Sequence, residues 1–363
     1  MKYTKLGRTG LVVSKLCLGT MTFGGQTGFW KYIGKQQQED ADELVRTAFN
    51  AGINFFDTAD VYSAGISEKM LGEAIRNNNL PRDEIVVATK VFGRVSMAVS
   101  EDASDKVKAE AERRENQAVN ISGLSRKHIM DGVEKSLDRL GMDYIDLYQV
   151  HGTDPLTPIE ETVEALDLLI RHNKVRYVGL CNMPAWLTMK AVAYAREKGL
   201  HRFESAQMYY SIAGRELERE VVPLAEDQDL AILPWSPLAG GFLSGKFTRD
   251  SDGPNDARRT VFDFPPIDKE QGFDIIDVMR DIAKAKKATV PQVALGWLLS
   301  RPHVTSVIIG ARTLDQLKDN LGAIDIEFTA EELASLDEVS ALKPEYPGWM
   351  LERQQADRKA QVE

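Results

Sequence analysis

The sequence predicts a single α/β domain over residues 1–342, a (β/α)8 (TIM) barrel of parallel strands, followed by a tail at 343–363. Two observations lead to this expectation. Eight short apolar runs alternate with amphipathic helical patterns, as in parallel strands joined by helical crossovers. The runs are apolar at consecutive positions, which is typical of strands buried on both faces. With 363 residues, the chain is long enough for a barrel of roughly 250 residues and additional loops.

Each expected element follows from a local pattern. The segment from Gly7 to Gly10 predicts the turn of an N-terminal hairpin. The expected strands are residues 15–20, 53–57, 85–90, 145–150, 175–180, 203–207, 230–235 and 306–309. Expected helices include residues 39–51, 126–140, 159–171, 187–198, 216–227 and 314–321. A doubly wound nucleotide-binding fold is disfavoured because Gly19 to Gly25, after the first strand, lacks Gly-x-Gly-x-x-Gly spacing.

Long loops at the C-terminal face and a C-terminal extension interrupt this alternation. Residues 94–123 are highly charged; 105–116 have the composition of an exposed helix without a core face. This segment could be a lid or a solvated insertion, and its charge favours the insertion. A second loop, 239–272, is rich in Gly and Pro. The tail begins with aromatic residues and ends in a polar stretch that we expect to be partly disordered.

The composition excludes several classes of function. A formal net charge of -10 at pH 7 argues against nucleic-acid binding, which depends on clustered Lys and Arg. No apolar run reaches the roughly 20 residues that span a membrane, and the N-terminus lacks an apolar signal core. Cys17 and Cys181 lie in apolar runs outside any Cys-x-x-Cys unit. We therefore expect a cytoplasmic protein with reduced thiols.

Ionisable residues lie at or just beyond the ends of three successive strands. Asp57, Lys90 and His151 would meet at the C-terminal mouth of the barrel, with Tyr62 five residues after the aspartate. A phenol, whose usual pKa is about 10, donates a proton more readily beside a cation, and Lys90 would supply that charge. Asp57 would balance the lysine, and neutral His151 would orient a substrate oxygen. This set suits carbonyl reduction, with hydride from a cofactor.

The same residues carry a family resemblance. The matching motifs are Gly52 to Tyr62, Ala88 to Lys90, Ser136 to Asp146 leading into His151, and Ile308 to Arg312. The chain resembles the aldo-keto reductases along nearly its whole length. Residues 235–246 are most similar to the branch that contains potassium-channel β-subunits and many bacterial reductases. The resemblance implies Tyr62 as general acid, Lys90 and Asp57 as its tuning pair, and His151 as the orienting group.

A nicotinamide cofactor would lie across the later strand ends. The amides of Asn182 and Gln207 suit its carboxamide, and the flat ring of Trp235 suits its nicotinamide. The resemblance implies that Arg312, alone or together with Arg258, pairs with a 2'-phosphate, which favours NADPH over NADH. The full expected cofactor set is Thr20, Met21, Asp57, Cys181, Asn182, Gln207, Trp235, Ser236, Pro237, Leu238, Ala239, Gly240, Lys246, Arg258, Gly310, Arg312, Gln316 and Asn320.

Two residues depart from the family pattern: Cys181 replaces a common Ser, and Ala311 removes a common hydroxyl. Other chemistries fit less well. Residues 240–247 nearly match a phosphate-binding P-loop, but Phe247 occupies the position of the Mg²⁺-binding Ser or Thr. A single strand-end histidine also disfavours a zinc hydrolase, so no metal is expected.

The expected substrate is a small-molecule carbonyl compound, for which a bulky aldehyde or ketone fits, or the corresponding alcohol in reverse. Met21, Phe23, Phe29 and Trp30 would form an apolar wall, with Trp349 from the tail. Trp349 could equally pack under the barrel or in a subunit contact, so the oligomeric state stays open. The alternative to an NADP(H)-dependent reductase is a cofactor-binding regulatory subunit with redox sensing as its output.

Overall fold

The centre of the molecule is a barrel of eight parallel strands. The computed structural model describes residues 1–25, 28–95, 103–251, 253, 258–359 and 361. The barrel strands are β3 (Leu16–Gly19), β4 (Phe55–Asp57), β5 (Val86–Val91), β6 (Ile145–Val150), β7 (Val175–Cys181), β8 (Phe203–Tyr209), β9 (Ala231–Trp235) and β10 (Val307–Ile309). They pair in the order β10-β3-β4-β5-β6-β7-β8-β9. A parallel bridge between Ile232 and Val304 brings β9 back beside the chain that enters β10. The predicted (β/α)8 barrel is confirmed.

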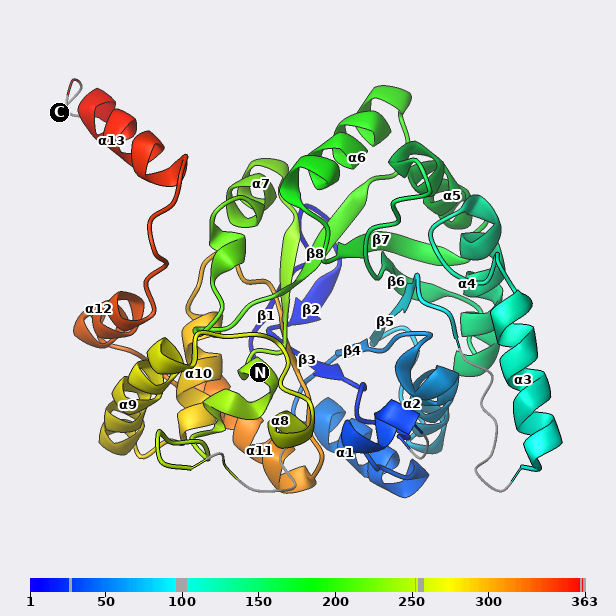
Figure 1. Ribbon diagram of the computed structural model, residues 1–363, viewed down its shortest axis with the longest axis horizontal. Coiled ribbons are helices and arrows are strands. Elements are labelled where there is room, and N and C mark those ends of the chain that lie inside the picture. The colour runs from blue at the N-terminus through cyan, green and yellow to red at the C-terminus, as the bar shows by residue number, and fades with distance from the viewer. Residues whose placement is uncertain (26–27, 96–102, 252, 254–257, 360, 362–363) are drawn as a thin grey trace.

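Helices form an outer ring around these strands (Figure 1). They are α1 (Gln38–Asn50), α2 (Ile66–Asn77), α4 (Arg126–Leu140), α5 (Ile159–Arg171), α6 (Ala185–Lys198), α7 (Val221–Gln228), α9 (Lys269–Lys286), α10 (Val290–Leu299), α11 (Leu314–Leu321) and α12 (Ala330–Val339). Short 3-10 turns are η1 (Gly28–Tyr32), η2 (Tyr62–Gly65), η3 (Glu216–Glu218), η4 (Ala239–Ser244) and η5 (Gly322–Asp325). Local caps explain why both ends of α4 match the predicted range 126–140. Ser125 accepts a hydrogen bond at the start of the helix, and Gly141, in a left-handed conformation, follows its end.

The helix predicted at residues 216–227 is divided in the structure. Turn η3 ends at Glu218, and α7 begins only at Val221. Pro223 explains the break, because proline lacks an N–H donor and is tolerated only in the first turn of a helix. The apolar periodicity was continuous across this position, so the pattern alone did not reveal the division.

Two apolar layers hold the barrel. Residues facing outward from the strands pack under the ring of helices in the larger cluster. Inside the barrel lies a smaller cluster: Cys17, Phe55, Val86, Ala88, Leu147, Ala231, Leu233 and Ile308. The hairpin of β1 (Tyr3–Lys5) and β2 (Val12–Ser14) closes the N-terminal end by adding Leu6 and Val13 to this interior. The inside is therefore apolar at its base, which leaves the opposite end for polar side chains.

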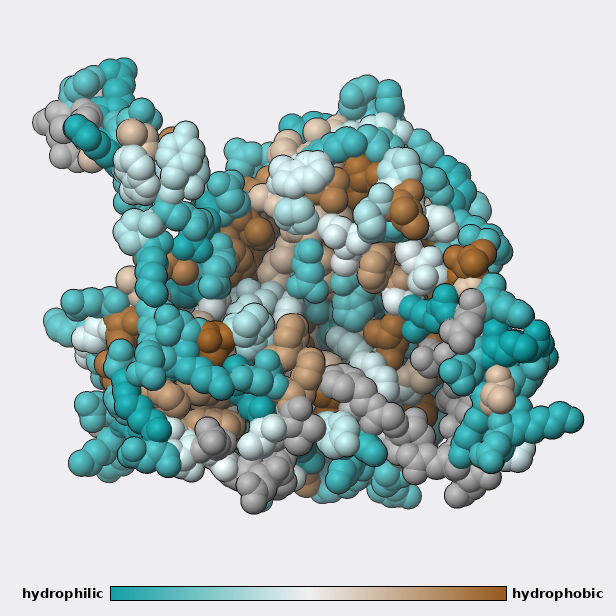
Figure 2. All heavy atoms as spheres, viewed as in Figure 1, coloured by the Kyte–Doolittle hydropathy of each residue, from teal (hydrophilic) through white to brown (hydrophobic). Residues whose placement is uncertain are grey.

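The segments outside this alternation lie in different parts of the molecule. Helix α3 (Asp105–Gln117) is mostly exposed, as expected for that part of 94–123, and Figure 1 shows it outside the ring. The segment 239–272 contains η4 and α8 (Arg258–Val261). The tail carries α13 (Gly348–Lys359), a helix that the sequence analysis did not predict, and it stands away from the barrel in Figures 1 and 2.

Candidate active site

A polar layer lies above the apolar interior of the barrel. Side chains alternate along a strand, so Asp57 points inward two residues after Phe55, and Lys90 does so two residues after Ala88. The same alternation on β6 and β8 turns Gln149 and Gln207 inward. These four side chains are at most 3% exposed. The sequence therefore places a buried polar ring at the C-terminal mouth.

Lys90 is the centre of this ring. Its ammonium donates to Asp57 Oδ2 at 2.5 Å, to the Thr58 carbonyl at 2.7 Å and to Tyr62 Oη at 3.2 Å. Burial has the largest single effect on the pKa of Lys90 and lowers it, but Asp57, Tyr62 and Cys181 together outweigh burial and raise the pKa above its usual value. The lysine is consequently a fixed cation beside the phenol. The predicted trio of Asp57, Tyr62 and Lys90 is brought together by the fold.

Two amides also hold Asp57. Gln149 Nε2 donates to Asp57 Oδ1 at 3.0 Å and Gln207 Nε2 does so at 2.9 Å. The carboxylate thus receives hydrogen bonds on both oxygens, which fixes its orientation toward the lysine. Sequence analysis quoted Gln149 within a motif but did not select it as a site residue. Side chains two residues apart on a strand point to the same face, and Gln149 lies two residues before His151. This spacing could have identified Gln149 as an inward-facing residue.

A strained turn holds Tyr62 against the lysine. Ser63, Ala64 and Gly65 all have positive φ angles, 49°, 55° and 87°, which is unfavourable for residues other than glycine. The Ser63 hydroxyl anchors the turn by donating to the Phe23 carbonyl at 2.8 Å. Tyr62 is 9% exposed, so the phenol reaches the site with little freedom to move.

His151 follows β6 and completes the set. Its ring meets that of Tyr62 edge-on, with centroids 5.8 Å apart. Burial, and then the Lys90 charge, lower the pKa of His151 to about 3, so the imidazole is neutral near pH 7 as expected. For Tyr62, burial raises the pKa above its usual value and outweighs the lowering effect of Lys90. The lysine acts in the expected direction, but the net shift is upward, and the phenol stays protonated at neutral pH.

A cavity of about 390 Å³ opens in front of these groups. Its predicted lining residues are Met21, Trp30, Asp57, Tyr62, His151, Asn182, Gln207, Trp235, Ser236, Pro237 and Gly310. Residues that the sequence analysis did not select are Gly19, Thr22, Ile33, Val61, Phe264 and Ile308. Phe264 is the largest of these, and its ring stacks with Trp235 at a centroid distance of 5.9 Å. It comes from the loop 239–272, where no periodic pattern indicated which aromatic residue turns inward.

Two expected pocket residues lie elsewhere. Phe23 is 1% exposed and belongs to the large apolar cluster between strands and helices, so it is a core residue. Trp349 is on α13, 46% exposed, and contacts Tyr346 rather than the cavity (Figure 1). The side chain of Phe29 lies outside the described part of the structure. The first loop therefore contributes Met21 and Trp30 to the cavity, and Trp30 meets the Tyr62 ring at 5.9 Å.

One end of the cavity continues into the loop after β9. Ser236, Ala239, Gly240 and Gly241 have positive φ angles in this loop. The N–H groups of Ala239, Gly240 and Gly241 donate within the turn to the Ser236 carbonyl, the Ser236 hydroxyl and the Leu238 carbonyl. The predicted cofactor residues Pro237 and Leu238 lie in this loop, and exposed Lys246 follows it.

The expected adenosine residues gather at α11. Thr313 caps this helix, and the Gln316 side chain accepts a hydrogen bond from the Arg312 N–H at 2.8 Å. Asn320 donates to the Gly310 carbonyl at 3.2 Å. The Arg312 guanidinium donates to the carbonyls of Tyr32 and Ile33. It therefore connects the loop after β10 to the loop after β3. The side chain of Arg258, at the start of α8, lies outside the described part of the structure.

Two expected cofactor residues are buried behind the cavity wall. Thr20 is fully buried, and its hydroxyl donates to the Asp57 carbonyl at 3.2 Å. Cys181 is also fully buried, with its sulfur 4.0 Å from Gln149 Oε1, and burial raises its pKa. Both support the polar ring from behind. The amides of Asn182 and Gln207, the flat indole of Trp235 and the start of α11 beside Arg312 together fit a dinucleotide.

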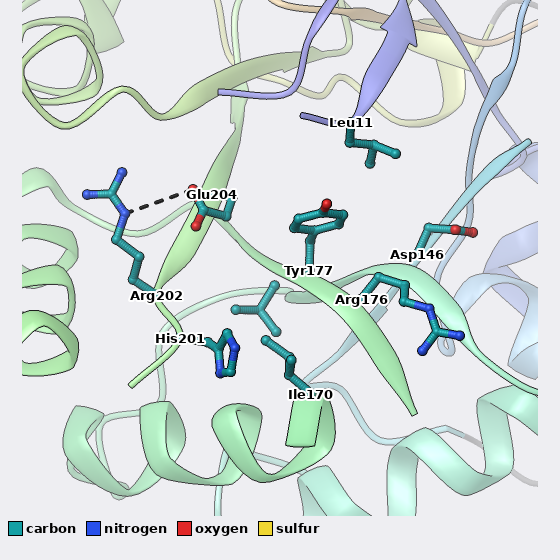
Figure 3. Close-up of a pocket in the computed structure, with 9 residues that line it drawn as sticks. Leu11, Asp146, Ile170, Arg176, Tyr177, His201, Arg202 and Glu204 are labelled. Atoms are coloured by element: carbon teal, nitrogen blue, oxygen red, sulfur yellow. Dashed lines mark ion pairs between the residues drawn. The ribbon is translucent and has the colours of Figure 1, made fainter. Parts of the chain in front are cut away.

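A second cavity of about 400 Å³ lies at the other end of the barrel (Figure 3). It is formed between Leu11 of the hairpin and the starts of β7 and β8, where Figure 3 shows Tyr177 facing Leu11. Its charged groups have partners of unequal quality. Arg202 donates from Nη2 to the Gln228 carbonyl, but its Nε lies 3.9 Å from Glu204 and makes no hydrogen bond among the described residues. His201 Nδ1 lies 2.7 Å from Asp167. It lies opposite the polar ring, and residues at this face of a barrel are expected to serve stability.

Comparison with known proteins agrees with the geometry. The profile of the Aldo/keto reductase family matches residues 15–341. The chain belongs to the aldo/keto reductase family. It is 34% identical to the versiconal hemiacetal acetate reductase of Aspergillus parasiticus over 352 residues, covering 96% of this chain and 99% of that protein. It is 36% identical to the uncharacterized oxidoreductase YrpG of Bacillus subtilis over 343 residues, covering 93% and 96%.

A third relative confirms the predicted branch. The chain is 33% identical over 352 residues to a protein of Oryza sativa subsp. japonica named "Probable voltage-gated potassium channel subunit beta", covering 95% of this chain and 98% of that protein. Aldo/keto reductases are oxidoreductases that act on carbonyl compounds with a nicotinamide cofactor, and the site described above has the groups for that chemistry. Among the described residues, no helix combines the length and apolar character needed to cross a membrane.

Proposed function

We propose that the protein reduces an aldehyde or ketone with NADPH and that Tyr62 donates the proton. The observation that carries this proposal is the 3.2 Å hydrogen bond between Lys90 Nζ and Tyr62 Oη at the wall of the cavity. A phenol held against a fixed ammonium is a proton donor whose conjugate base is stabilised as it forms. His151 shares the same wall.

The protein's own groups would act in a simple order. Neutral His151 and protonated Tyr62 both present hydrogen-bond donors to the substrate oxygen, which polarises the carbonyl. As negative charge builds on that oxygen, Tyr62 transfers its proton and becomes a phenolate beside Lys90. Asp57, held by two amides, keeps the lysine charged and in place throughout. Reversal of these steps oxidises an alcohol.

The cofactor would lie along the residues that already converge on the cavity. Asn182 and Gln207 would bind the carboxamide, and Trp235 would stack on the ring. The turns after β9 and the start of α11 would take the phosphates, with Arg312 at the 2'-phosphate. When bound, a reduced nicotinamide supplies the hydride that reduces the carbonyl carbon. The chain itself binds the cofactor, orients the substrate and supplies the proton.

The cavity wall favours an aromatic or otherwise flat apolar substrate. Trp30, Trp235 and Phe264 contribute three aromatic rings to this wall. Rings of this kind bind flat apolar groups through stacking and edge contacts. We therefore place aryl aldehydes and aryl ketones first among candidate substrates.

A substrate panel tests the proposal. Purified protein should consume NADPH, followed by its absorbance, with aryl aldehydes at a higher kcat/KM than with short aliphatic aldehydes. Binding of NADPH without consumption across the whole panel would contradict the reductase function and favour the cofactor-sensing alternative. A preference for small hydrophilic carbonyls would contradict the substrate class alone.

A further inference from the structure

A second buried cluster of charges lies behind the proposed site. Glu68, in the first turn of α2, is fully buried. One of its oxygens accepts a hydrogen bond from the Thr89 hydroxyl at 2.6 Å, and the other pairs with Arg139 Nε at 2.5 Å. Arg139, in the last turn of α4, also donates to the Ser136 hydroxyl at 3.3 Å. In the described part of the chain, none of these residues lines the cavity, so they do not touch a bound substrate.

Through Thr89, the cluster reaches the catalytic lysine. Thr89 and Lys90 are neighbours on β5, and their side chains point to opposite faces of the strand. Lys90 points into the barrel, while Thr89 points outward to the first turn of α2. The short bond to Glu68 therefore fixes β5 from behind at the position next to the lysine.

Through Gly65, the cluster reaches the proton donor. The side chain of Arg139 packs against the strained turn that follows Tyr62, because a Cβ built on Gly65 would lie 2.7 Å from Arg139 Cδ. Left-handed residues in succession persist only where surrounding contacts enforce them. The arginine is thus a contact beneath the turn that aims the phenol.

A third acid lies beside this pair. Asp60 is 2% exposed, and burial, followed by the charge of Glu68, raises its pKa well above the usual range. A balanced buried pair adds little stability over apolar residues of equal shape, so its presence here calls for another role.

We propose that Glu68 and Arg139 are positioning residues for proton transfer. This inference rests on the proposed reductase function. Tyr62 and Lys90 come from different elements, a turn after β4 and a strand, and the Glu68–Arg139 pair connects the supports of both. It holds Tyr62 Oη within hydrogen-bond distance of Lys90 Nζ. A misplacement of about 1 Å in a reacting group lowers a rate on the order of a hundredfold.

The test replaces the cluster with apolar residues of similar shape, Glu68→Leu, Thr89→Val and Arg139→Met together. Because both charges and the Thr89 hydroxyl are removed together and only the Ser136 hydroxyl loses a partner, we expect the unfolding midpoint to stay close to that of the unmodified protein. We expect kcat to fall by about tenfold or more, with a larger solvent deuterium isotope effect, and NADPH affinity to stay within about twofold. If the cluster served stability alone, the triple variant would keep both the unfolding midpoint and the kcat of the unmodified protein.

A second variant tests the same role if the triple variant does not fold. Arg139→Lys keeps the buried positive charge but not the guanidinium that pairs with Glu68, so kcat should fall about threefold or more at unchanged NADPH affinity. Asp131→Asn on α4 is the control: its exposed pair with Lys127, at 2.8 Å, contacts no site residue among those described, and kcat should not change.

The outcomes separate the two proposals. Unchanged kcat in Arg139→Lys, or a stable triple variant with unchanged kcat, would overturn the positioning role. An equal loss of kcat and NADPH affinity would also overturn it. Absence of NADPH turnover in the unmodified protein would instead overturn the reductase function.

Discussion

His151 should make the protein less stable in mild acid. Burial lowers its pKa from the usual value of 6.5 to about 3. Between these values the unfolded chain binds a proton and the folded chain does not, so the free energy of unfolding falls as pH falls. From pH 7.5 to pH 5.0, the shift corresponds to a loss of about 2 kcal/mol. Because the ring is partly exposed to the cavity, screening by water makes this an upper value.

Urea unfolding of the protein and of His151→Gln, at both pH values, measures this contribution. Burial also lowers the pKa of His128 and His303, so the unmodified protein and the variant share that part of the acid sensitivity. We expect the unmodified protein to lose up to about 2 kcal/mol more than His151→Gln between pH 7.5 and pH 5.0. If the two proteins lose the same free energy, His151 is not held neutral by its surroundings and the reasoning fails.

Three further predictions follow from single contacts. Arg312→Ala should raise KM for NADPH by about tenfold and KM for NADH much less, in steady-state kinetics with both cofactors; equal effects would remove Arg312 from the 2'-phosphate. Gly72→Ala should destabilise the protein by about 3 kcal/mol in urea unfolding, because its Cβ would lie 2.0 Å from the Leu140 carbonyl oxygen, whereas Gly10→Ala, with open space, should be neutral. Phe264→Ala should raise KM for aryl aldehydes about fivefold with kcat unchanged; an unchanged KM would exclude its ring from the substrate wall.

The barrel and its catalytic ring were predictable because both depend on strand periodicity. Eight runs of consecutive apolar residues indicated strands buried on both faces, and all eight are present. Parallel strands bring their C-terminal ends to one mouth, so the ionisable residues at or just beyond three of those ends had to converge. Asp57, Lys90 and His151 were therefore found without any knowledge of their contacts.

The remaining site residues depend on contacts that no local pattern encodes. Glu68 reads in the sequence as an ordinary acid in the first turn of an amphipathic helix, and only the fold shows it buried against Arg139. Phe264 lies in a loop, where spacing says nothing about side-chain direction. Trp349 shows the reverse problem, because its aromatic character suggested a pocket, but α13 stands away from the barrel.

Helix α10 shows why a buried helix is hard to recognise from an amphipathic pattern. Its residues from Val293 to Leu298 are all buried, so it presents no polar face and no amphipathic period. Its limits come instead from local caps: Thr289 and Gln292 form a capping box at its start.

The measurement that tests the central claim most directly is NADPH turnover and NADPH binding by Tyr62→Phe. The substitution removes one oxygen, the atom 3.2 Å from Lys90 Nζ, and leaves the ring to fill the same space. Loss of a general acid typically costs about a hundredfold to ten-thousandfold in rate. The proposed mechanism therefore predicts a fall in kcat on the order of a hundredfold or more, with NADPH affinity unchanged in a fluorescence titration. Turnover at the rate of the unmodified protein would contradict the assignment of Tyr62 as the proton donor.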